Sequence, residues 1–174
     1  ILACGAWLGQ TLEPLGFEVD VRPQKGQLRD YFFEGLDTGK LPVLMPEGEL
    51  DIIPFAGGKI SVGASHENDQ GFDLTVVETV LASLEEEAKT YFPDLSTVKS
   101  FSERVGTRAY TSDFSPFFGE VPELESVFVA SGLGSSGLTT GPLIGKNLVE
   151  LAMNRPGSLD SADYPVAQYV KKKD

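Results

Sequence analysis

Two short stretches of this sequence carry residue types that could do chemistry. The first is a loop with glycines at Gly132, Gly134 and Gly137, which follows a short β-branched run and opens a helical pattern. Glycines let the backbone approach a ligand, and the free N–H groups of a helix start attract electron-rich groups. The second is Arg108, whose planar guanidinium fork matches a carboxylate. We expect the helix start and this guanidinium to face one common hollow.

The loop reads GxGxxG between a strand and a helix, which is the pattern of a dinucleotide-binding fingerprint. That unit also needs a second strand with an acidic residue roughly 20 positions further on. Here Asn154-Arg155-Pro156-Gly157-Ser158 and a polar tail follow instead. The unit therefore ends a fold, and we do not expect it to be the main pyrophosphate cradle. The alternative is a tight strand-to-helix turn that contacts no ligand.

Bulk properties exclude several classes of function. The formal net charge of −12 argues against nucleic acid and anionic membranes as partners, and no apolar run is long enough to span a membrane. The single cysteine, Cys4, allows no internal disulfide and fits a cytoplasmic location. The single histidine, His66, makes a metal site or a catalytic triad improbable. Because the chain starts at Ile1, within an apolar run, we interpret it as a piece of a longer polypeptide.

Two apolar runs are typical of buried strands. Residues 1–4 stop at Gly5, and residues 127–131 stop at Gly132. In open α/β sheets, ligands bind outside the carboxyl ends of such strands. We therefore predict that the two strand ends face one site.

In the middle of the chain, apolar residues recur with a different spacing. Residues 17–21 alternate between apolar and polar, and residues 51–55 and 59–64 flank Ala56-Gly57-Gly58, a good hairpin signal. A further strand or two cover residues 98–110. The sequence predicts an α+β fold in which an antiparallel sheet with a flanking helix is joined to remnants of a parallel-sheet domain.

The flanking helix is predicted from a capping box and an apolar stripe. Thr75 and Glu78 have the spacing of a capping box, and Pro93 ends the pattern. The run Glu85-Glu86-Glu87 is expected to be a solvated face of this helix.

Arg108 has a second interpretation. It is equally consistent with a structural arginine that forms an ion pair with Asp113 or with a glutamate. Ser135 and Ser136 lack the histidine partner of a serine nucleophile, so a serine hydrolase is not predicted.

Taken in order, several segments resemble the C-terminal half of the FAD-dependent amine oxidoreductases of the D-amino acid oxidase and glycine oxidase family. The resemblance covers about residues 1–154. Its landmarks are Ile1-Leu2-Ala3-Cys4-Gly5-Ala6-Trp7, Arg22-Pro23-Gln24-Lys25-Gly26-Gln27, Arg108 with Thr111-Ser112-Asp113, Pro116-Phe117-Phe118-Gly119, and residues 132–142.

The resemblance implies a domain layout. Residues 1–12 and 120–155 would belong to an FAD-binding domain, residues 13–119 would form a substrate-binding domain, and residues 156–174 would be a polar tail. The N-terminal half that grips the ADP moiety would be missing from this chain. We therefore expect the chain alone to be colourless and inactive.

The resemblance also implies site residues. The last helix would direct its N-terminus at the flavin N1–C2=O2 edge, and FAD would be bound noncovalently, since no cysteine lies near Arg108 or the glycine loop. Arg108 would hold the substrate carboxylate, and Ser135 would add a second substrate contact. The cofactor contacts would come from Gly5, Ala6, Trp7, Gly134, Ser135, Ser136, Gly137, Leu138 and Thr139.

The implied reaction is oxidation of an amino acid or secondary amine by hydride transfer to the flavin, which gives an imine and then a keto acid. It would need no protein side chain to act as an acid or a base, and the protein would only orient the substrate. The alternative from another class is a non-enzymatic acidic interaction module whose glycines only form turns.

Overall fold

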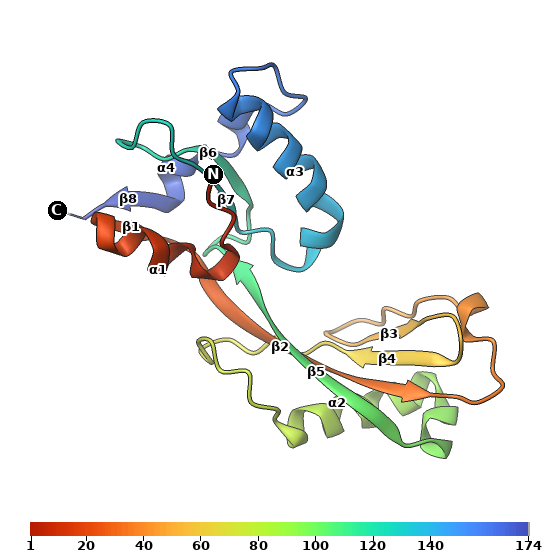
Figure 1. Cartoon of the computed structure of the whole chain (residues 1–174). Helices are drawn as coiled ribbons and strands as arrows, with labels where there is room; N and C mark the ends of the chain where they lie inside the picture. Colours follow the sequence, from red (N-terminus) through yellow and green to blue (C-terminus); the bar gives the residue numbers. More distant parts are fainter. Residues whose placement is uncertain (174) are drawn as a thin grey trace. The chain divides into compact units, whose positions relative to one another are not determined.

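The computed structural model describes residues 1–173 and divides them into two compact units (Figure 1). The first unit comprises residues 1–24 and the chain from Arg108 onward, and the second comprises residues 25–107. The division falls within strands β2 (Arg22–Phe32) and β5 (Ser100–Tyr110). The predicted boundaries between an FAD-binding and a substrate-binding domain, after residues 12 and 119, stay a prediction and do not coincide with this division into compact units. The reason is that residues 13–21 pair with the C-terminal segment, and the end of β5 packs on the glycine loop.

The first unit contains most of the helical elements. Two antiparallel strand pairs, β1 with β8 and β6 with β7, form its sheets. Its elements are η1 (Gly5–Trp7), α1 (Leu8–Leu12), η2 (Glu13–Leu15), β1 (Phe17–Val19), β6 (Phe117–Glu120), β7 (Phe128–Ser131), η5 (Gly134–Ser136), α3 (Gly137–Ala152), η6 (Ser161–Asp163), α4 (Val166–Tyr169) and β8 (Val170–Lys172).

Residues 156–174 are predicted to be a polar tail, but within 156–173 three residues belong to the core. Val166, Tyr169 and Val170 are buried in the core around Phe17 and Phe117. Their spacing places them on one side of α4 and the start of β8, where burial of apolar surface offsets the cost of ordering the chain. β8 then pairs with β1, Val19 lying opposite Val170.

The predicted strand at residues 1–4 is reduced to a single parallel bridge between Leu2 and Val129. Leu2 donates its N–H to the Phe128 carbonyl at 2.7 Å and accepts from the Ala130 N–H at 3.2 Å. The strand ends there because a 3-10 turn begins at Gly5, whose φ of +55° is costly for other residues. The bridge still places the two predicted strand ends side by side.

The second unit is a four-stranded sheet in the order β3-β4-β2-β5, which confirms the predicted fold class (Figure 1). β3 (Asp51–Pro54) and β4 (Lys59–Gly63) form the predicted hairpin, with Pro54 opposite Ile60, and β2 pairs antiparallel with β4. Its helical elements are η3 (Thr38–Lys40), α2 (Glu78–Tyr91) and η4 (Pro93–Thr97).

Helix α2 begins later than the capping box predicted. Its N-cap is Val77, and the Thr75 hydroxyl donates to Asp73 at 2.6 Å instead of capping the helix. The helix ends at Tyr91, before Pro93, as predicted. Leu84 and Ala88 pack into a core with buried residues of the sheet and the loops around it, Tyr31, Phe33, Leu50, Ile52, Ile60 and Val62 among them.

The glutamate run on α2 is only partly solvated, which is a second correction. Glu85 accepts hydrogen bonds from Arg29 at 3.0 Å and from the Tyr31 hydroxyl at 2.7 Å. Arg29 is 6% exposed and also contacts Glu78 and Glu103. Burial opposes the charge on Glu85, but the hydrogen bonds from Tyr31, Lys89 and Arg29 outweigh it, and its pKa is lowered. Glu85 therefore links the helix to the sheet.

A second buried charge lies on the same sheet. Asp30 is 1% exposed and accepts hydrogen bonds from Arg104 at 2.9 and 3.1 Å and from Ser61 and Ser102, with the Lys59 ammonium 3.0 Å away. Burial penalises the charged carboxylate, but these donors and cations outweigh that effect and hold its pKa well below the usual range. Asp30 therefore ties three strands together.

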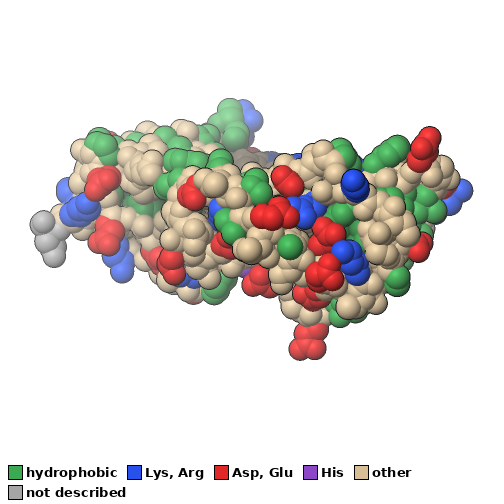
Figure 2. Space-filling view, turned by 90° about the horizontal axis from the view of Figure 1, so that it is seen from below, with side chains coloured by type: hydrophobic (Ala, Val, Ile, Leu, Met, Phe, Trp, Pro, Cys, Tyr) green, Lys and Arg blue, Asp and Glu red, His purple; other side chains and the backbone are tan. Residues whose placement is uncertain are grey.

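On the face drawn in Figure 2, acidic side chains are scattered with basic ones among them, and the chain has a formal net charge of −12. No helix within residues 1–173 is both long enough and apolar enough to cross a membrane.

Removal of the Asp30 charge should make the protein less stable and change how its stability depends on pH. We expect Asp30→Asn to lower the free energy of unfolding at pH 7 by about 2–4 kcal/mol, because Arg104 and Lys59 lose their buried partner. Since the folded pKa lies below the unfolded one, the contribution is present above the unfolded value near 4 and is lost as the pH falls further.

Denaturant unfolding at several pH values between 7 and 3 measures this effect. The variant should lose less stability than the parent protein over the acid range, and Asp94→Asn, at an exposed position, should behave like the parent. Parallel pH profiles for Asp30→Asn and the parent would show that the Asp30 carboxylate does not make this contribution.

Candidate functional site

The site is built in the first unit, around the ends of β7 and η1. The Ser131 hydroxyl, on the last residue of β7, donates to the Gly5 carbonyl at 3.0 Å. Together with the Leu2–Val129 bridge, this bond holds the two glycine-containing turns next to each other. No atom of the described residues lies within 4 Å of the place where a Cβ would stand on Gly5, so this turn borders open space.

The glycine loop after β7 is closely packed on the segment that follows β5. A Cβ on Gly132, at φ +76°, would stand 2.8 Å from the Ser115 carbonyl oxygen and 2.9 Å from Thr111 Cγ2. A Cβ on Gly134, at φ +52°, would stand 2.5 Å from the ring of Tyr110. These two positions require glycine, both for their backbone conformation and for lack of space.

Tyr110 connects the end of β5 to this loop. Its side chain is 9% exposed. Its hydroxyl lies 2.5 Å from Ser135 Oγ and accepts a hydrogen bond from the Ser135 N–H at 3.2 Å. The ring and the hydroxyl thus fix consecutive residues of the loop immediately before α3.

The N-terminus of α3 follows directly on the 3-10 turn η5 and has no side-chain cap. The first amides of an α-helix have no partner within the helix, and no side chain caps them here. The nearby hydroxyls are directed to carbonyls instead: Ser136 donates to Leu133, and Thr139 and Thr140 donate to Ser136. Leu138, the second residue of α3, is 95% exposed. This helix start can therefore receive an electron-rich group.

Arg108 lies on β5, two positions before Tyr110, and is half-buried. Because alternate residues of a strand point to the same side, Arg108 and Tyr110 share one side of β5. The strand that brings Tyr110 to the glycine loop therefore carries Arg108 on the same side.

The turn after β5 is held by Asp113. Its carboxylate accepts hydrogen bonds from the Thr111 hydroxyl at 3.0 Å, from the Ser115 N–H at 3.1 Å, and from Gln168 and Tyr169. The Ser115 bond is the largest influence, and together these donors lower the pKa of Asp113. Asp113, which the sequence offered as an ion partner for Arg108, thus has several hydrogen-bond donors of its own.

The predicted cofactor contacts are distributed over the three elements η1, η5 and α3. Gly5, Ala6 and Trp7 form η1, in which Ala6 is buried and Trp7 is 45% exposed. Gly134, Ser135 and Ser136 form η5, and Gly137, Leu138 and Thr139 are the first three residues of α3.

The sequence did not point to Tyr110 as a site residue. The contact of its ring with the loop is possible because Gly134, a residue distant in the sequence, has no side chain. An aromatic residue two positions after an arginine in a strand is too common a pattern to indicate such a contact.

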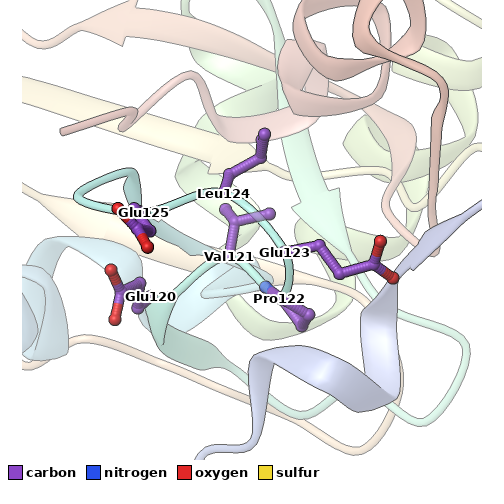
Figure 3. A pocket seen from close by; sticks show the side chains of 6 residues that line it. All are labelled: Glu120, Val121, Pro122, Glu123, Leu124 and Glu125. Carbon is purple, nitrogen blue, oxygen red and sulfur yellow. The ribbon is translucent and has the colours of Figure 1, made fainter.

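A hollow of about 400 Å³ lies elsewhere in the first unit, at the turn between β6 and β7 (Figure 3). It is lined by Glu120, Val121, Pro122, Glu123, Leu124 and Glu125. Figure 3 shows Glu120 and Glu125 on one side, while Glu123 points away to its ion pair with Lys172. The hollow is formed by six consecutive residues of one turn and holds none of the predicted site residues.

Comparison with known proteins identifies the family. Residues 1–151 match the DAO family, described as FAD dependent oxidoreductase. The chain belongs to this family. The match confirms the resemblance predicted from the motifs, and enzymes of this family use FAD.

Individual relatives agree with the assignment. The chain is 38% identical over 168 residues to the uncharacterized oxidoreductase YurR of Bacillus subtilis and 30% identical over 167 residues to glycine oxidase of Pseudomonas aeruginosa. Each alignment covers 96% of this chain and 45% of the relative. The chain therefore spans about half the length of the curated relatives it matches.

Solved structures show the same fold. The iminodiacetate oxidase from Chelativorans sp. BNC1 superposes with a TM-score of 0.89 at 32% identity, over 93% of this chain and 44% of that one. The glycine oxidase from Geobacillus kaustophilus gives a TM-score of 0.81 at 23% identity, over 95% and 44% of the two chains.

The residues at the start of α3 fit one edge of FAD. Uncapped amides and an exposed second residue suit a flat group with electron-rich oxygen and nitrogen atoms. The open space beside Gly5 gives such a group room on a neighbouring element. Gly137, Leu138 and Thr139 would hold this edge through their backbone N–H groups.

Substitution of Gly134 should disturb the loop. In the full-length protein, we expect Gly134→Ala to lower the free energy of unfolding by about 2–4 kcal/mol, because the new methyl group clashes with Tyr110 and the residue keeps a positive φ. FAD affinity, measured by titration of the apoprotein, should fall with it.

Gly145→Ala is the matched control. Gly145 lies within α3, and no described atom lies within 4 Å of its Cβ position, so alanine should stabilise the helix by about 0.5–1 kcal/mol. Equal stability and FAD affinity in the two variants would contradict the close packing of Gly134 on Tyr110.

Proposed function

We propose that this chain is part of an FAD-dependent enzyme that oxidises an amino acid or a secondary amine carrying a carboxylate. In that enzyme, this chain would bind the substrate carboxylate and one edge of the flavin. The observation that carries the proposal is the contact between the end of β5 and the loop just before α3. Tyr110, which shares a side of β5 with Arg108, is hydrogen-bonded to the residue just before the uncapped helix start. One strand, β5, thus carries the guanidinium that would bind a carboxylate, and through Tyr110 it also fixes the loop that leads to the α3 amides.

Arg108 has the role of binding the substrate carboxylate. A guanidinium can hold both carboxylate oxygens at once, and this fixes the orientation of the carbon that carries the amine. The names of the similar enzymes support this class, since glycine and iminodiacetate are both amines with a carboxylate one carbon away.

The α3 amides have the role of electrostatic stabilisation. They are fixed before the reaction, so they can stabilise developing negative charge without reorganising. When bound, noncovalently, FAD supplies the acceptor for the hydride that leaves the substrate carbon. The chain offers a single histidine, and the proposed role of its residues is to orient the substrate rather than to transfer protons.

Ser135 has the role of a second polar contact at the substrate side of the loop. It is exposed, and its backbone is fixed by Tyr110. A hydroxyl at this place can accept from or donate to a small polar substrate, but it cannot neutralise a second carboxylate. We therefore expect a monocarboxylate to be preferred over a dicarboxylate, to be measured with a panel of small amino acids and secondary amines.

Removal of the guanidinium should weaken substrate binding more than it slows the chemical step. In the full-length enzyme, we expect Arg108→Ala to reduce kcat/KM by the equivalent of about 2–5 kcal/mol, mainly through KM, because a buried carboxylate pair is lost. Arg108→Lys should recover part of the loss, since it restores the charge but not the two-pronged geometry.

Arg155→Ala, at an exposed position after α3, is the control and should keep the parent KM. Steady-state kinetics over a range of substrate concentrations measures all three variants. An Arg108→Ala enzyme with parent kinetics would refute this role for the guanidinium.

A further inference from the structure

We propose that Tyr110 is a positioning residue that holds the start of α3 in place and thereby sets the reduction potential of the bound flavin. The inference rests on the proposed function, because it assumes that the α3 amides face the flavin edge. It concerns the residues of this chain that fix those amides.

The first step of the argument is the double attachment of the loop to Tyr110. The ring occupies the space that a side chain on Gly134 would need, and the hydroxyl bonds both the N–H and the Oγ of Ser135. Two consecutive residues are thus fixed by one side chain. Gly137, where α3 begins, lies two residues further along the chain.

The second step is that Tyr110 is itself held firmly. Its side chain is 9% exposed, and the ring of Phe114 meets it edge to face, with centroids 5.2 Å apart. Phe114 has a φ of +61°, which is costly for a bulky residue and persists only where the surroundings impose it. The hydrogen bonds of Thr111 and Ser115 to Asp113 form the turn that imposes it.

The third step is that, among the described residues around the α3 start, no other hydroxyl accepts from the backbone N–H groups of this loop. The α3 start has no side-chain cap, and the hydroxyls of Ser136, Thr139 and Thr140 are directed to carbonyl oxygens. If the Tyr110 hydroxyl is removed, the Ser135 N–H loses its acceptor, and the loop before the helix loses its hydrogen bonds to β5 while keeping the local bond from Ser136 to Leu133. Amides that can reorient stabilise a nearby negative charge less than fixed ones do.

The test is Tyr110→Phe in the full-length FAD-loaded enzyme, which keeps the ring and removes only the hydroxyl. Because negative charge at the flavin edge grows on reduction, we expect the midpoint potential to become more negative. The rate constant for flavin reduction by substrate should fall about 3- to 10-fold, the usual effect of one lost hydrogen bond. KM should change less than it does in Arg108→Ala, since the guanidinium is unchanged and only the Ser135 contact loses its support.

Tyr31→Phe is the matched control. It also removes a tyrosine hydroxyl, one that donates to Glu85 in the second unit. We expect it to lower the thermal midpoint while the flavin potential stays at the parent value. A Tyr110→Phe enzyme whose potential and reduction rate equal those of the parent would overturn the proposal, whatever happens to its stability.

Ser135→Ala keeps the test decisive if Tyr110→Phe does not fold. It removes one of the two contacts of the hydroxyl and should shift the potential in the same direction by a smaller amount, and an unchanged potential would count against the proposal. Arg108→Lys separates this inference from the proposed function. If KM is unaffected in Arg108→Lys while the potential shifts in Tyr110→Phe, the carboxylate role fails and the positioning role stands.

Discussion

The packing of the Tyr110 ring on the backbone of Gly134 is the contact on which the arrangement of the site depends. A glycine leaves room for an aromatic ring directly against the chain, and the positive φ of the same residue turns the chain toward the helix. Any side chain at this position would push the ring and the loop apart. The place where α3 starts is therefore decided by a residue on β5, far away in the sequence.

The same region shows how local strain and buried polar groups are balanced. Phe114 adopts a backbone conformation that bulky residues avoid, and Asp113 compensates by accepting hydrogen bonds from both ends of the turn and from Tyr169 in α4. The C-terminal segment thus supports the turn that supports the site. Residues near the end of the chain therefore help to stabilise the site, which their polar composition does not indicate.

The second unit is stabilised in a different way. Among the buried charges of its sheet are those of two neighbouring residues, Arg29 and Asp30, which point to opposite sides of β2. Arg29 is surrounded by carboxylates, one of them Glu85 on α2, and Asp30 is surrounded by cations and hydroxyls. A buried charge is tolerated only when it is paired with opposite charge or hydrogen-bond partners, so these two networks specify how the strands and the helix fit together.

The sequence by itself determined the family, the hairpin of β3 and β4, the end of α2 before Pro93 and the strand–glycine–helix unit. These features depend on local patterns, namely alternation, proline and glycine chemistry, and helical spacing, which act over a few residues. The sequence misjudged the start of α2, the glutamate run and the last residues of the chain. For the glutamate run and the last residues, a partner from a distant segment outcompeted the local preference, whereas Thr75 is held by Asp73 only two residues away.

Only the tertiary structure decided that Tyr110 fixes the glycine loop, that Glu85 belongs to an ion-pair network, and that Val170 is buried in a two-stranded sheet with β1. The physical reason is that each of these facts is a contact between residues far apart in the chain. Such contacts depend on where the backbone brings the two residues, and a single sequence records the residues without recording their distance.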